Sequence, residues 1–140
     1  MYTRQNQIQI TSTIEEEAKE IIYNTFYRVT GISEDEIYPD TDYIEEFGLD
    51  DLDMIELMIE IDRHIETKYR GSYKNVLNSG FYISDKLSRW CYCNVMCLDN
   101  SGKIDSDRIS ERYSNLYKNA PTFQDLCEIY AEYISVLRLL

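Results

Sequence analysis

The stretch GISEDEIYPDTDYIEEFGLDDLDMIELMIEIDRHIE, residues 31–66, decides the fold of this protein. Its second part predicts a helix from about Asp51 to Thr67, because apolar residues recur there at helical spacing. Asp50 or Asp51 can cap that helix, since a carboxylate accepts hydrogen bonds from the free N–H groups of the first turn. The residues expected on its apolar side are Leu52, Ile55, Met58, Ile59 and Ile65, with Asp53, Glu56, Glu60 and Asp62 on the remainder.

The first part of the stretch predicts a long loop. It contains Pro39, one of two prolines, and it has no sustained hydrophobic period. A loop of this length usually has a function. Its isolated apolar residues, expected to anchor it to the core, are Ile32, Ile37, Tyr43 and Phe47.

Two further helices are expected on either side of this stretch. One runs from about Thr13 to Thr30, with Ser12 or Thr13 as its cap and Gly31 closing it. The other begins at Thr122, where PTFQD supplies a proline, a cap and an acidic residue three positions further on. We therefore expect a mostly α fold in a single domain, residues 1–140, with residues 1–12 disordered.

The segment 69–121 is harder to interpret. SDRISERYSNLYKN, residues 106–119, has the period of a helix. KLSRWCYCNVMCL, residues 86–98, is apolar nearly all round, so a helix and a strand both remain open for it.

Composition excludes several classes of partner. Lys and Arg number 14 against 26 Asp and Glu, and the formal net charge is -12. Such a surface repels nucleic acids and anionic membranes, and it attracts basic protein surfaces. No stretch has the length and hydropathy of a signal peptide or a membrane span, so we expect a cytoplasmic protein. The oligomeric state is left open.

No catalytic or metal site is indicated. His64 is the only histidine, and no glycine-rich phosphate loop occurs among 5 glycines, which argues against an enzyme. Three of the 4 cysteines lie in CYCNVMC, but the spacing is a poor match for a zinc knuckle. CLDNSGKIDSDR, residues 97–108, resembles a calcium loop, but Cys97 and Arg108 occupy its first and twelfth positions.

From about residue 14 to residue 67, the sequence resembles the acyl carrier proteins of fatty acid and polyketide synthesis. The family's order is present in residues 31–66: a glycine ending a helix, an acidic stretch, an isoleucine, a proline two residues on, an anchored loop and an attachment motif opening a helix. TFQDLCEIYAEYI, residues 122–134, is similar to the family's final helix. The resemblance implies an acyl carrier-like helical bundle, enlarged between its second and last helices by an insertion at 69–121.

The resemblance also points to a degenerate attachment position. Family members carry a phosphopantetheine arm on the serine of an Asp-Ser-Leu motif, which reads Asp50, Asp51 and Leu52 in this sequence. An aspartate offers no hydroxyl for the transfer, and its charge repels the donor's phosphate. We therefore expect no phosphopantetheine, unless the native residue at position 51 is serine. Asp51 is then an ordinary helix cap, or a fixed charge where the family has its phosphodiester.

The resemblance implies a partner-binding surface on the second helix. Acidic residues beside exposed aliphatic side chains suit a basic partner with a shallow apolar patch, whereas the simpler interpretation is a solvated helix face. The expected partner-binding residues are Asp50, Leu52, Asp53, Ile55, Glu56, Ile59 and Glu60.

Three functions fit these observations. The first is a non-catalytic acyl carrier-like protein that binds partners through its acidic second helix. The second is a small acidic immunity protein or antitoxin that inhibits a basic toxin, for which the 13 tyrosines would supply contact area. The third is a genuine acyl carrier protein whose serine has been replaced.

Overall fold

The structure, a computed structural model, describes residues 8–96, 101, 103, 105 and 108–140, without the side chains of residues 109, 110 and 113. These residues contain seven α-helices, one 3-10 turn and no strand, as expected for a mostly α fold. The elements are α1 (Ser12–Thr30), η2 (Glu34–Glu36), α2 (Tyr43–Phe47), α3 (Asp51–Tyr69), α4 (Tyr73–Leu77), α5 (Asp85–Met96), α6 (Ile109–Asn119) and α7 (Phe123–Leu139).

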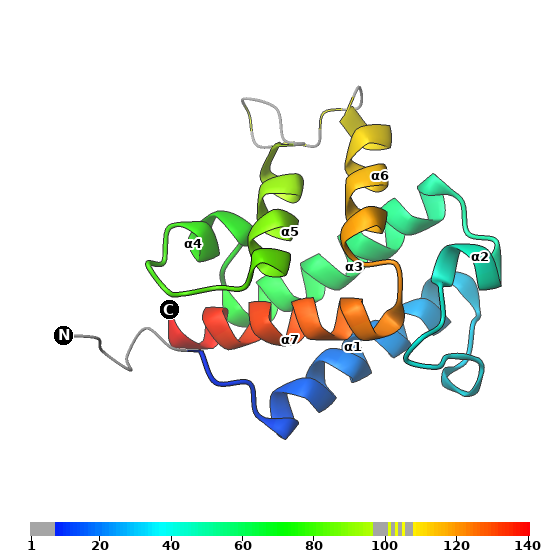
Figure 1. The fold of residues 1–140 in the computed structure, drawn as a ribbon, viewed down its shortest axis with the longest axis horizontal. Coiled ribbons are helices and arrows are strands. Elements are labelled where there is room, and N and C mark those ends of the chain that lie inside the picture. The colour runs from blue at the N-terminus through cyan, green and yellow to red at the C-terminus, as the bar shows by residue number, and fades with distance from the viewer. Residues whose placement is uncertain (1–7, 97–100, 102, 104, 106–107) are drawn as a thin grey trace.

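Helix α7 lies at the centre of the bundle. It packs against α1 and α3, and α5 and α6 stand side by side across it, with α4 beside α5 (Figure 1). Its side chains are buried on most sides, including Phe123, Tyr130 and Tyr133. One hydrophobic cluster joins residues of α1, α3, α4, α5, α6 and α7. Segment 69–121 therefore shares the core of the other helices.

Local chemistry sets the helix boundaries. The cap of α1 is Thr11, whose side chain accepts from Ile14 N at 3.3 Å, one residue earlier than the expected Ser12 or Thr13. Gly31 ends α1 with φ +79°, a conformation that costs glycine little. Thr122 caps α7 in a reciprocal pair with Asp125, as expected. Disorder was expected in residues 1–12, but Ser12 belongs to α1, and residues 1–7 lie outside the described part.

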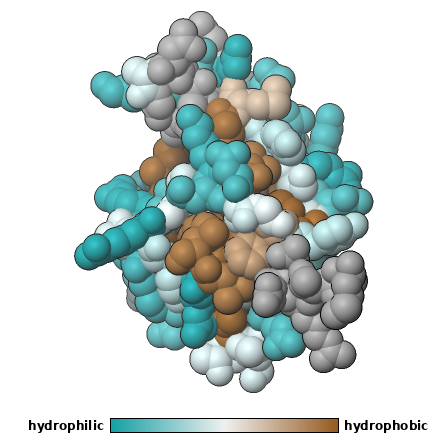
Figure 2. Space-filling model, turned by 90° about the vertical axis from the view of Figure 1, so that its left-hand side faces the viewer, coloured by the Kyte–Doolittle hydropathy of each residue, from teal (hydrophilic) through white to brown (hydrophobic). Residues whose placement is uncertain are grey.

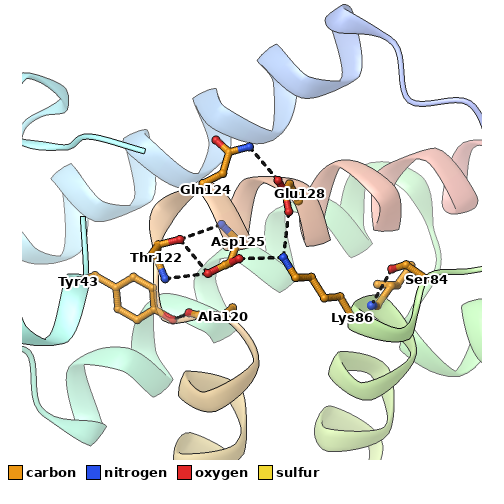
Figure 3. Close-up of polar contacts among 9 residues, drawn as sticks. Tyr43, Ser84, Lys86, Ala120, Thr122, Gln124, Asp125 and Glu128 are labelled. Atoms are coloured by element: carbon orange, nitrogen blue, oxygen red, sulfur yellow. Dashed lines mark hydrogen bonds and ion pairs between the residues drawn. The ribbon is translucent and has the colours of Figure 1, made fainter. Parts of the chain in front are cut away.

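The long connection between α1 and α3 is fastened to the start of α7. Asp42 and Thr122 form an isolated antiparallel bridge, and Gln124 N donates to Pro39 O at 2.9 Å. Tyr43 is fully buried, and its hydroxyl donates to the carbonyl of Ala120 (Figure 3). The expected anchoring of this connection is confirmed for Tyr43 and Ile37, which are buried. The structure adds the short helix α2, which the sequence period did not predict.

Polar contacts join α5 to α7. Lys86 Nζ donates to Asp125 Oδ1 at 2.8 Å and to Glu128 Oε2 at 3.0 Å (Figure 3). Ser84 N donates to Glu132 Oε2 at 2.8 Å, one turn further along α7. For residues 86–98 the sequence left helix and strand as alternatives. The structure shows a helix over Asp85–Met96, which lies along one side of α7.

Candidate functional site

The first turn of α3 is the part of the fold to which the sequence assigned the attachment position. Asp50 is the N-cap: its Oδ1 accepts from Asp53 N at 2.8 Å, and Asp53 Oδ2 accepts from Asp50 N at 3.1 Å. This reciprocal pair satisfies two free N–H groups and places both charges at the positive end of the helix dipole. Asp50 was one of the two caps expected, and the structure confirms it.

Asp51 is the first residue of α3. It is half-buried, and its Oδ1 accepts from the N–H of Leu52 at 3.1 Å. No ion pair neutralises it among the described residues. The next side chain, Leu52, is 69% exposed. Asp51 therefore presents an unneutralised carboxylate next to a solvent-exposed aliphatic side chain.

The apolar face of α3 differs from the expected one. Leu52 was expected on the buried side, but it is exposed, and Ile59 is half-buried. Ile55 was expected to serve a partner as well, but it is 8% exposed and packs beside Tyr43 and Leu116. Of the three aliphatic residues expected to contact a partner, only Leu52 is largely free to do so. The side chains that α3 buries are Met54, Ile55, Leu57, Met58, Ile61, Asp62 and Ile65.

The acidic residues of α3 are not equivalent. Glu56 is exposed and forms no ion pair among the described residues. Glu60 lies 3.5 Å from Arg28 Nη2 of α1, and it also accepts from Arg63 one turn along α3. Because two arginines already pair with Glu60, a partner's cation would gain less binding energy from Glu60 than from Glu56.

The excess negative charge of the protein is confined to one segment. Residues 29–62 contain no Lys, Arg or His and 13 of the 26 acids, which leaves 13 acids against 14 Lys and Arg in the rest of the chain. Both ends of the segment lie on helices, and the connection between them carries exposed acids around α2 and the start of α3. The 13 acids are Glu34, Asp35, Glu36, Asp40, Asp42, Glu45, Glu46, Asp50, Asp51, Asp53, Glu56, Glu60 and Asp62.

The comparison with protein families found a match, and it includes the acidic segment. Residues 20–69 match the model of a phosphopantetheine attachment site. This part of the chain is therefore similar to phosphopantetheine attachment domains. It spans α1 from its middle, the acidic connection and the whole of α3, the region in which the sequence resembled acyl carrier proteins. No curated protein and no solved structure gave a significant match.

The attachment position does not present the chemistry that phosphopantetheine needs. Attachment requires a hydroxyl, whereas Asp51 has a carboxylate, and the flanking Asp50 and Asp53 add like charge. The two serines closest in sequence are engaged elsewhere. Ser33 Oγ donates to Glu36 at 3.3 Å beside η2, and Ser72 Oγ donates to Asn75 at 2.9 Å at the start of α4. The residue at the attachment position therefore does not offer the hydroxyl that the arm needs.

The structure reveals a buried polar cluster that the sequence did not predict. Asp62, expected on the polar side of α3, is 8% exposed, and its Oδ1 accepts from Tyr73 at 2.6 Å and from Tyr130 at 2.9 Å. Trp90 Nε1 donates to the Tyr73 hydroxyl at 3.0 Å. Burial raises the pKa of Asp62 to about 7, although the Tyr73 hydroxyl and the nearby charge of Arg112 oppose that shift.

The structure gives less support to the other candidate sites that the sequence offered. Cys91, Cys93 and Cys127 are buried, and the described residues contain no group of three or more metal-binding side chains. Burial raises the pKa of Cys91 to about 12 and that of Cys127 to about 11. His64 is exposed. The calcium-like sequence 97–108 falls largely outside the described residues.

Within the part of the chain that is described, no helix combines the length and apolarity needed to span a bilayer.

An apolar surface lies on the opposite side of the molecule from α2 and the exposed acids around it. Figure 2 shows apolar side chains gathered on the side where Figure 1 places the C-terminus and α4, whereas α2 lies at the opposite side. Leu139 and Leu140, at the end of α7, are 54% and 59% exposed. The charged and the apolar surfaces are therefore separate features.

Proposed function

We propose that this protein is a carrier-like domain that does not carry phosphopantetheine and that acts by binding a basic protein surface. The family of residues 20–69 supports a carrier-type function, and carrier domains are not themselves catalysts. The observation on which the finer proposal rests is Asp51, a carboxylate at the attachment position, within a segment that has no basic residue.

The contact surface of the proposal is narrower than the whole second helix. Asp50, Asp53 and Glu56 provide charge, and Leu52 provides exposed apolar area. The acids around α2, Glu45 and Glu46, extend this surface because they are exposed too. Charge of this density speeds encounter with a basic partner, and the central leucine supplies apolar burial.

Asp51 has a specific role in this proposal. A carrier's phosphodiester presents negative charge to the basic pocket of its partner enzyme, and Asp51 presents a permanent negative charge at the same position. Within the described part of the chain, the Asp51 side chain accepts from the neighbouring Leu52 N through Oδ1, which leaves its second oxygen available. A partner's lysine or arginine can then pair with Asp51 without any modification of the protein.

Photo-crosslinking in the native host tests the proposed surface. A photoreactive amino acid at Leu52 should capture one protein that carries a basic surface patch. The same amino acid at Tyr82, which is 83% exposed and lies outside the acidic segment, is the control. Equal crosslinking patterns from the two positions would contradict the proposal.

Charge reversal then tests the electrostatic part with the captured partner. Glu46→Lys combined with Glu56→Lys should weaken the complex at least tenfold and flatten its dependence on salt. Glu16→Lys combined with Glu20→Lys changes the net charge equally at exposed positions of α1 and should have a small effect. Equal losses in the two double variants would show that net charge alone is responsible.

The identity of the captured protein separates the alternatives. A synthase or ligase supports the carrier-like proposal, whereas a toxin supports the immunity protein or antitoxin, which would use the same acidic surface. A genuine carrier with a replaced serine predicts serine at position 51 of the native gene and one added phosphopantetheine in the intact mass of the protein from its native source.

A further inference from the structure

A cavity of about 650 Å³ lies between the C-terminal half of α3 and the helices α4, α5 and α6. This volume is within the range of small-molecule sites. Asp62, in its wall, is eleven residues beyond Asp51 along α3, or about 16 Å at the helical rise. The cavity is therefore separate from the attachment position. Its wall includes Ile59, Asp62, Glu66, Tyr73, Asn94 and Arg112.

Arg112 of α6 is the principal charged group of this wall. It is 4% exposed, and its Nη2 donates to Asn94 Oδ1 at 2.5 Å. Its Nε is buried and has no hydrogen-bond acceptor among the described residues. A buried donor without an acceptor costs folding free energy, so a further acceptor that reaches the Nε of Arg112 would be favourable.

The carboxylates of the wall leave the Nε of Arg112 without an acceptor. Asp62 Oδ2 forms an ion pair with Arg112 Nη2 at 3.6 Å, which is longer than a hydrogen bond, and Asp62 Oδ1 accepts from Tyr73 and Tyr130. Glu66 Oε1 accepts from Tyr133 at 2.9 Å. Tyrosine hydroxyls from the core thus donate to both acids, whereas the Nε of Arg112 has no acceptor among the described residues.

Two more cations line the same cavity. Arg63 and Lys74 are exposed; Arg63 pairs with Glu60, whereas Lys74 forms no ion pair among the described residues. Three of the 14 basic residues of a strongly acidic chain therefore line one cavity, and among the described residues Lys74 is the one of the three that forms no ion pair. This arrangement favours an anion, but Asp62 and Glu66 would repel a second negative charge, so it favours a monoanion.

Apolar side chains complete the wall. Ile59 of α3 and Val95 of α5 are half-buried and both line the cavity. They offer a surface against which a short hydrocarbon body can be removed from water. A ligand that uses the whole wall is therefore anionic at one end and apolar at the other.

We propose that this cavity binds a small monocarboxylate with an apolar body, whose carboxylate accepts hydrogen bonds from Arg112. Lys74 attracts the ligand at the mouth of the cavity, and Ile59 and Val95 contact its hydrocarbon part.

Titration with octanoate, followed by the amide and methyl NMR signals of the full chain, tests this proposal. Octanoate should give saturable shifts at Asn94 and Val95, whereas octan-1-ol and octylammonium, which have the same chain length, should bind at least tenfold more weakly. Absence of saturable shifts up to millimolar octanoate would overturn the proposal. Equal binding of the three compounds would overturn the assigned charge.

Two variants separate binding from folding. Arg112→Gln should abolish octanoate binding while the far-ultraviolet circular dichroism stays native. Lys74→Glu changes an exposed residue, so the fold is retained, and it should weaken octanoate binding at least threefold. Lys118→Glu makes the same charge change on α6 at an exposed position outside the cavity. Equal weakening by Lys74→Glu and Lys118→Glu would contradict a contact at the mouth.

Discussion

Asp62 should make the protein less stable as the pH rises towards 7. Its ordinary pKa of 3.8 is raised to about 7 by burial in the fold. Between these two values the native state binds more protons than the unfolded state, so the free energy of unfolding falls as pH increases. Below about pH 4 both states are protonated, and above about pH 7 both are ionised, so the contribution is then constant.

The size of the effect follows from the shift. Each pKa unit corresponds to about 1.4 kcal/mol, so raising the pH from about 5 to about 8 should remove about 3 kcal/mol of stability. Glu66 adds to the loss because burial raises its pKa as well. Glu17 and Asp125 have lowered pKa values, so they act only at more acidic pH.

Replacing the buried acid isolates its contribution. Asp62→Asn keeps an oxygen that can accept from Tyr73 and Tyr130, but it removes the titrating proton. The variant should therefore lose most of the dependence on pH between about 5 and 8. Glu56→Gln is the control, since it removes the same charge from an exposed position of α3 and leaves the buried cluster intact.

Urea unfolding followed by tryptophan fluorescence measures this difference. Trp90 is the single tryptophan, it is fully buried, and it donates to the Tyr73 hydroxyl of the same cluster. The reasoning is refuted if wild type and Asp62→Asn show the same pH dependence within about 1 kcal/mol. It is refuted equally if Glu56→Gln flattens the dependence as much as Asp62→Asn.

Three further predictions concern the core. Thr122→Ala removes the cap of α7 and should cost about 1 kcal/mol in urea unfolding, whereas Thr122→Ser should retain most of it; equal losses would contradict the capping role. Tyr43→Phe leaves the buried carbonyl of Ala120 without its donor and should cost about 1–3 kcal/mol; an unchanged unfolding midpoint would contradict that contact. Cys91 and Cys127 should react slowly with iodoacetamide at pH 8 and quickly in urea, because burial raises the pKa of both thiols; rapid native labelling in peptide mapping would contradict this.

The sequence predicted what local chemistry decides. Helices α1, α3 and α7 have sustained apolar periods and polar caps, so their positions could be predicted to within about two residues. The ambiguity over α5 arose because its apolar side chains are not confined to one stripe. The structure resolves it, since α5 packs against α4, α6 and α7 and therefore buries more than one side.

The buried polar cluster around Asp62 could not be predicted from the hydrophobic period of the helices. Asp62 looks exposed as a residue type, but it lies four residues after Met58 and three before Ile65, in register with the buried stripe. That register was the available signal. Its partners Tyr73, Tyr130 and Arg112 come from three other helices, so only the tertiary structure shows that they satisfy a buried acid. The expectation for Leu52 was wrong in the opposite sense, since Leu52 is 69% exposed whereas Met54, two residues further on, is buried.

The most direct test of the central claim is the intact mass after incubation with coenzyme A and a phosphopantetheinyl transferase of broad specificity. The claim predicts an unchanged mass for the wild-type protein and one added phosphopantetheine for Asp51→Ser, which restores the hydroxyl on the same scaffold. Modification of the wild-type protein would contradict the claim and make this chain a working carrier.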